Sequence, residues 1–99
     1  MDKLKKFELM EKIVRELEDV KRSQQAVLEK IGKVEVDNIE LGDSRLEKVL
    51  PEIYQRTADN SDAITDLLSS FAETTDEFAA KNKVDQLRQQ QEAGGNRNA

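Results

Sequence analysis

The sequence has no cysteine, no histidine and no tryptophan, and these absences remove whole classes of chemistry. Without cysteine and histidine there is no disulfide, no thiol nucleophile, no imidazole base and no Cys/His zinc site. The four glycines form no phosphate-binding loop. The composition therefore predicts that the protein is not an enzyme and that it takes no cofactor, no metal and no small-molecule substrate.

Long apolar runs are also missing. No stretch approaches the ~18 uncharged apolar residues of a membrane span, and residues 1–12 lack the apolar core of a secretory signal. These two absences predict a cytoplasmic protein or one incorporated into a particle. Residues 51–80 carry one basic and seven acidic side chains, which argues against a nucleic-acid groove.

Core-forming residues are scarce, whereas charged residues are abundant. Hydrophobic residues make up 36% of the chain and charged residues 37%, against roughly 45–50% and ~25% in ordinary globular domains. Such a chain can bury a narrow stripe along a helix more easily than a thick core. We therefore expect an all-α protein of long helices, arranged as a coiled coil or as a helical hairpin or bundle.

The first half of the chain has two columns of residues at seven-residue spacing. Eight of their ten members are apolar, which predicts a helix–helix interface of the coiled-coil type. Three consecutive valines in the second column argue against a parallel dimer and favour a trimer or another homo-oligomer. The Met10 column consists of Met10, Leu17, Gln24, Ile31 and Asn38, and the Ile13 column of Ile13, Val20, Val27, Val34 and Leu41.

Two members of the Met10 column, Gln24 and Asn38, are polar. Buried amides at such positions cost stability but favour one register and one oligomeric state, where they pair with each other. The alternative interpretation is that the interface weakens at these two positions.

The first pattern ends at a set of helix-breaking residues. Gly42 suits the left-handed end of a helix, and Ser44 with Glu47 suits a capping box at the start of the next. Pro51 predicts that the second helix either starts near residue 51 or starts at Ser44 and kinks. Residues 33–41 also alternate as a strand would, although helix is the favoured prediction.

The second half has two further columns in a shifted frame, with an apolar stripe broad enough for a helix in a bundle. Because one uninterrupted supercoil cannot satisfy both frames, a break or hairpin near Gly42 is expected. Asn60 predicts either a buried polar layer or, with Ser61, a local helix break. The Leu50 column consists of Leu50, Thr57, Ile64, Phe71 and Phe78, and the Leu46 column of Leu46, Ile53, Asn60, Leu67 and Thr74.

These patterns divide the chain into four segments. Residues 1–41 form a heptad-patterned helix, residues 42–51 a break or hinge, and residues 52–88 a second amphipathic helix. Residues 89–99 are polar and rich in glycine and asparagine, which predicts a flexible tail.

Two functions fit this organisation. The first is a structural or assembly protein, such as a virion part or a scaffold, that associates with itself and binds at least one other protein. The second is a small helical hairpin that acts as an adaptor, regulator or chaperone by binding a helix of a partner protein. No nucleic acid and no membrane is expected as a partner.

Overall fold

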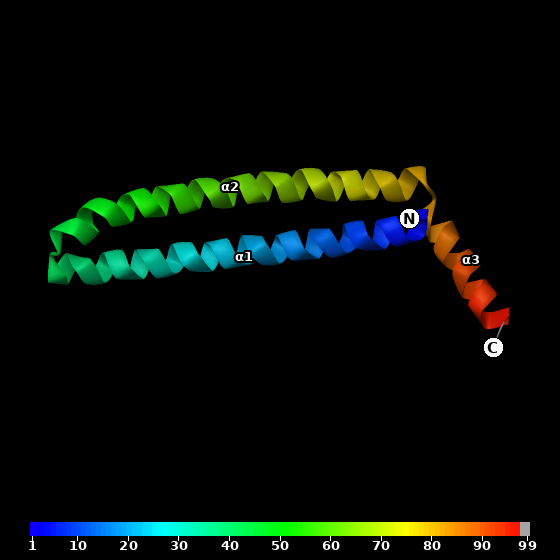
Figure 1. The fold of residues 1–99 in the computed structure, drawn as a ribbon, viewed down its shortest axis with the longest axis horizontal. Helices are drawn as coiled ribbons and strands as arrows, with labels where there is room; N and C mark the ends of the chain where they lie inside the picture. The colour runs from blue at the N-terminus through cyan, green and yellow to red at the C-terminus, as the bar shows by residue number, and fades with distance from the viewer. Residues whose placement is uncertain (98–99) are drawn as a thin grey trace. The chain divides into compact units, whose positions relative to one another are not determined.

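The computed structural model describes the backbone of residues 1–97 and the side chains of residues 1–92. Within residues 1–97 it contains three α-helices and no strand: α1 (Lys3–Leu41), α2 (Ser44–Lys81) and α3 (Val84–Arg97) (Figure 1). The expected all-α fold is confirmed, and residues 33–41 are helical rather than extended.

The chain forms two compact units. The hairpin unit comprises Leu17–Leu68, and the terminal unit comprises Met1–Glu16 together with Ser69–Ala99. Helices α1 and α2 each contribute a segment to both units.

The hairpin unit turns at two residues, Gly42 and Asp43. Gly42 has a φ of 74°, and its N–H donates to the carbonyl of Asn38 at 2.7 Å, so α1 ends in the left-handed conformation that glycine tolerates best. The Oδ1 atom of Asp43 accepts a hydrogen bond from the N–H of Leu46 at 2.9 Å. The cap of α2 is therefore Asp43, and the expected Ser44 cap is wrong because Ser44 already lies in the first helical turn.

The side chain of Asn38 closes this turn. It is 7% exposed, and its amide makes two hydrogen bonds to the backbone of Asp43. Its Nδ2 donates to the Asp43 carbonyl at 3.1 Å, and its Oδ1 accepts from the Asp43 N–H at 2.9 Å. A single buried amide thus ties the last turn of α1 to the first residue after the bend.

Pro51 lies inside α2, so the second helix starts at Ser44 and continues through the proline. Because proline has no N–H, the carbonyl of Glu47 loses its usual partner four residues on. The ribbon of α2 bends in this region, as expected where a proline interrupts the ladder of helical hydrogen bonds (Figure 1). Helix α2 is also continuous through Asn60 and Ser61, so the local break considered for these residues is not present.

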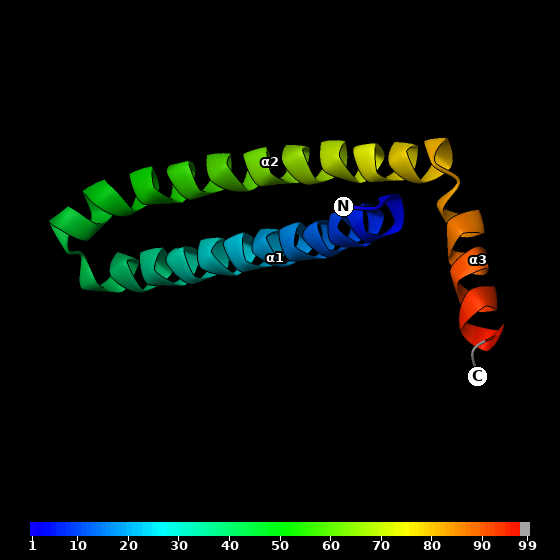
Figure 2. The same ribbon diagram turned by 45° about the vertical axis from the view of Figure 1, so that its right-hand side comes forward.

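The two helical segments of the hairpin unit run antiparallel and lie side by side in both ribbon views (Figures 1 and 2). Their less exposed residues recur at alternating steps of three and four, the pattern of a coiled-coil seam. The seam has a substantial polar content. It includes the half-buried side chains of Lys21, Gln24, Glu35 and Thr57 and the buried Ser61.

The terminal unit contains the best-buried apolar side chains among the described residues: Phe7, Met10 and Val84. Val84, at 1% exposed, is the first residue of α3. The chain reaches it through a break after Lys81, where Lys83 adopts a φ of 51° and the Asn82 side chain donates to the Phe78 carbonyl at 3.0 Å. The sequence pattern missed this break and ran the second helix on to residue 88.

Helix α3 extends to Arg97 and so covers most of the segment expected to be a tail. Residues 98 and 99 lie outside the described residues. The flexibility of residues 89–99 stays a prediction.

The role of Asn38 gives a paired test. Replacing Asn38 with leucine removes both hydrogen bonds to Asp43, so we expect the free energy of unfolding to fall by about 1–2 kcal/mol. Replacing the half-buried Gln24 with leucine should raise it by about 1 kcal/mol, because apolar area is buried and the described residues hold no hydrogen bond to the Gln24 side chain.

Urea unfolding at a single protein concentration measures both changes. Equal stabilisation by the two leucines would contradict the turn-closing role of Asn38. It would instead favour amides that pair between chains.

Candidate functional site

The structure separates the four predicted columns into two inner and two outer ones. Every member of the Met10 column and of the Leu50 column is buried or half-buried, so both columns pack inside their units. The members that lie in the hairpin unit are Leu17, Gln24, Ile31, Asn38, Leu50, Thr57 and Ile64, and those in the terminal unit are Met10, Phe71 and Phe78.

Each inner column has a partner column that the sequence analysis did not identify. On α1, it comprises Phe7, Val14, Lys21, Leu28 and Glu35, all buried or half-buried. Two of these five residues are charged, so a search for apolar residues at seven-residue spacing did not find the column. Long charged side chains can nevertheless pack their aliphatic carbons against a seam and keep the charged group in solvent. On α2, the partner column comprises Tyr54, Ser61, Leu68 and Thr75, of which Tyr54 is the one exposed member, and Asn82 continues its spacing just beyond the helix.

The Ile13 and Leu46 columns lie outside the seam. In the hairpin unit, Val20 and Val27 are each 42% exposed, Ile53 is 38% exposed and Leu67 is 55% exposed, whereas Leu46 is half-buried. Asn60 is exposed too, so it forms no buried polar layer within the chain. Ile13 and Thr74 belong to the terminal unit, where Ile13 is half-buried and Thr74 is exposed. The predicted interface role of these outer columns stays a prediction.

In the hairpin unit the two outer columns share one side of the helix pair. Each outer column follows an inner column by three residues, which places it about 60° further round its helix. Gln24 on α1 borders the same surface depression as Ile53 and Asn60 on α2, so the Leu46 column lies on the Gln24 side of the seam. We call this side the valine face, defined by Val20, Val27, Val34, Leu41, Leu46, Ile53, Asn60 and Leu67.

The valine face is more apolar than the seam beneath it, since seven of its eight residues are apolar. Within residues 17–68, all of which are described, the buried side chains are Asn38 and Ser61, and no apolar side chain is fully buried. A helix pair without a buried apolar core is marginal in water, because helices gain most of their stability by packing an apolar face. The hairpin unit therefore keeps its apolar surface where another molecule can cover it.

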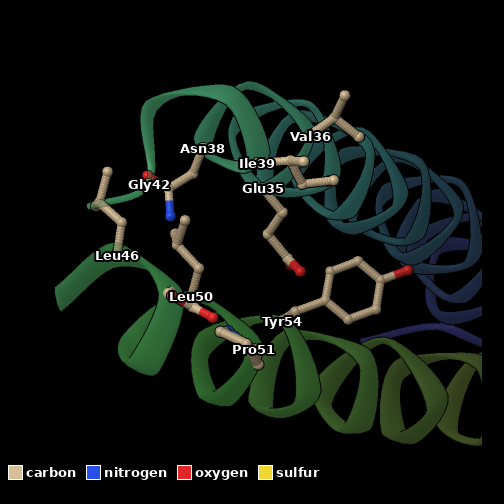
Figure 3. A pocket seen from close by; sticks show the side chains of 11 residues that line it. Glu35, Val36, Asn38, Ile39, Gly42, Leu46, Leu50, Pro51 and Tyr54 are labelled. Carbon is tan, nitrogen blue, oxygen red and sulfur yellow. The ribbon is translucent and has the colours of Figure 1, made fainter. Parts of the chain in front are cut away.

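A second apolar feature lies near the turn of the hairpin unit (Figure 3). This tip cavity has a volume of about 570 Å³. Its apolar walls include Val36 and Ile39 from α1 and Leu50 and Pro51 from α2, with Tyr54 at one end. Ile39 follows the inner residue Glu35 by four positions, about 40° round α1 and away from the Met10 column. The tip cavity therefore opens mainly on the flank opposite the valine face, although the two features share Leu46, which also lines the cavity.

The terminal unit gathers cations around two aromatic rings. Arg88 of α3 donates to Oε1 of Glu11 at 2.8 Å, and its guanidinium lies 5.2 Å from the ring centroid of Phe7. Nζ of Lys6 lies 5.2 Å from the ring centroid of Phe78. Such contacts contribute roughly 0.5–1 kcal/mol each at exposed sites. They hold α3 against α1. Among the described residues, no buried side-chain nitrogen or oxygen atom lacks a hydrogen-bond partner.

The described residues contain no group of three or more acidic side chains placed to hold a metal ion. Among the same residues, no helix combines the length and the apolarity that crossing a membrane requires. Comparison with known protein families, curated proteins and solved structures gives no match. Among the described residues, the valine face and the tip cavity are therefore the surface features that bear on function.

Two glycines of the hairpin unit allow a matched test of this geometry. A Cβ atom added at Gly32, inside α1, meets nothing within 4 Å, so Gly32→Ala should raise the free energy of unfolding by about 1 kcal/mol. Gly42→Ala should lower it by about 1 kcal/mol, because the positive φ at the turn strains any residue with a side chain. Thermal unfolding of the two variants measures whether each substitution raises or lowers the stability. A stabilising effect of Gly42→Ala would contradict the described turn.

Proposed function

We propose that the protein is a non-enzymatic structural or assembly protein that associates with copies of itself and binds another component of a larger assembly. The observation that supports this proposal most directly is the distribution of apolar surface in the hairpin unit. Its inner seam is mixed in polarity, whereas the valine face outside it carries seven apolar side chains. Exposed apolar faces of this kind are typical of protein–protein interaction sites.

Self-association is favoured by the character of the valine face. It consists mostly of valine, leucine and isoleucine and includes no charged residue, so the same face on a second copy can pack against it without burying a charge. Two hairpin units joined in this way would bury four helical segments around a shared core, the arrangement of a helix bundle. Such an association would supply the buried apolar core that residues 17–68 lack on their own.

The alternative is a monomeric adaptor or chaperone whose hairpin receives a helix of another protein on the valine face. The observation that favours it is the turn closed by Asn38, because that turn completes a helix pair within one chain. The two helices present apolar residues at regular spacing along the valine face. Such a surface suits a partner helix whose apolar side chains are three, four and seven residues apart.

Mass measurement by light scattering distinguishes the two functions. We expect the wild-type protein to have the mass of two or more chains, against 11.3 kDa for one. Val27→Glu should shift the mass to that of one chain, because it places a charge in the centre of the valine face.

Ala26→Glu is the matched control, since it adds the same charge at an exposed neighbouring position. It should leave the mass unchanged. A wild-type protein that stays monomeric and helical would overturn self-association and leave the adaptor function as the better account.

A further inference from the structure

The tip cavity has the size of a binding site rather than of a packing defect. Its volume of about 570 Å³ lies within the roughly 300–1,000 Å³ of ordinary ligand pockets. Two of its apolar walls reach far into solvent, since Val36 is 64% exposed and Ile39 is 82% exposed. Isolated exposed apolar residues need no explanation, but here they border a concave site. This combination indicates an occupant that extends beyond the cavity and covers its rim.

Gly32 adds an independent indication. It lies in the interior of α1, where a glycine costs about 1 kcal/mol relative to alanine. No atom of the described chain requires the missing side chain, because a Cβ atom there would meet nothing within 4 Å. Gly32 lines the tip cavity, so the absent side chain enlarges the site and lets another molecule approach the helix backbone closely.

The net charge around the tip cavity indicates which sign of charge the occupant carries. Residues 33–52 carry six acidic and three basic side chains, a net charge of −3. Glu35 and Glu47 both line the tip cavity, and Figure 3 shows the Glu35 side chain extending from α1 into the space between the helices. Among the described residues, no ion pair involves either glutamate. Carboxylates beside an apolar site favour a cation attached to an apolar group.

Pro51 adds a polar feature to the same wall. It cannot donate a backbone hydrogen bond, so the carbonyl of Glu47 lacks its partner from the helical ladder. Both residues line the tip cavity. The acceptor left free by Pro51 therefore belongs to a residue of the cavity wall.

We infer that the tip cavity binds a basic amphipathic helix of a partner protein, with apolar side chains between the helices and lysine or arginine beside Glu35 and Glu47. A helix fits better than a small molecule because the exposed Val36 and Ile39 extend the apolar surface beyond the cavity. The inference rests on the proposed binding of another component. According to this inference, that component binds mainly on the flank opposite the valine face, and it is positively charged.

The single tyrosine provides a local reporter. Tyr54 lines the tip cavity, and the chain has no tryptophan, so its fluorescence reports on this site alone. The probe is an amphipathic helical peptide built only of leucine and lysine, and the comparison peptide has glutamate in place of every lysine. We expect the lysine peptide to change the Tyr54 emission to saturation, and the glutamate peptide to leave it unchanged.

Gly32→Leu fills the cavity without removing any side chain from its walls and should weaken binding of the lysine peptide by about tenfold or more. Ala26→Leu is the matched control, because it adds the same side chain at an exposed position of α1 outside the cavity. It should bind the peptide as the wild type does. Val27→Glu should also retain binding, so a failure of self-association and a failure of the tip site give different results.

Three results would overturn the inference: equal responses to both peptides, undiminished affinity in Gly32→Leu, or saturation by phenethylamine as tight as by the lysine peptide. The first would remove the charge preference. The second would place the peptide elsewhere, and the third would make the occupant a small amine rather than a helix.

Discussion

The turn held by Asn38 is the constraint on which the arrangement of the hairpin unit depends. Its buried amide makes two hydrogen bonds to Asp43, while Gly42 supplies the positive φ that reverses the chain. Once the turn is closed, the short connection fixes which faces of α1 and α2 meet. The inner columns then form the seam, and most residues of the two outer columns stay exposed. Both candidate surfaces are consequences of that choice of faces.

The seam that results has an unusual balance of polarity. Two of its polar members are satisfied locally, since the buried Asn38 bonds to the turn and the Thr57 hydroxyl donates to the Ile53 carbonyl at 2.9 Å. Such a seam can specify the pairing of two helices while contributing little apolar burial. Most of the exposed apolar side chains of the hairpin unit lie on the valine face and around the tip cavity. This separation of pairing specificity from apolar burial is the feature on which the proposed self-association rests.

Much of the fold follows from the sequence, whereas the choice of seam does not. Seven-residue periodicity predicted helices on both sides of Gly42, and the structure contains them. The same periodicity favoured the Ile13 column over the partner column that contains Lys21 and Glu35, because it counted apolar residues. In the structure the charged residues are half-buried and Val27 is exposed. Periodicity identifies every apolar stripe on a helix, but it does not decide which stripe the chain itself covers.

The ends of the helices show the same limit on a smaller scale. Asp43 and Ser44 are both good capping residues, so the sequence alone could not choose between them. The break at Asn82 and Lys83 contains neither glycine nor proline. It accompanies the burial of Val84 in the terminal unit, a tertiary effect that outweighs the cost of a positive φ at Lys83. The tip cavity was likewise beyond prediction, because it depends on how α1 and α2 meet near the turn.

Helices α1 and α2 of the hairpin unit pair within one chain, and both candidate surfaces depend on this pairing. A distance measurement between nitroxide labels on cysteines introduced at Gln24 and Asn60 tests this claim most directly, since the chain has no cysteine of its own and both residues border one depression. We expect a short distance that persists when labelled protein is mixed and refolded with an excess of unlabelled protein. A short distance that disappears on this dilution would show that the helices pair between chains, and it would contradict pairing within one chain.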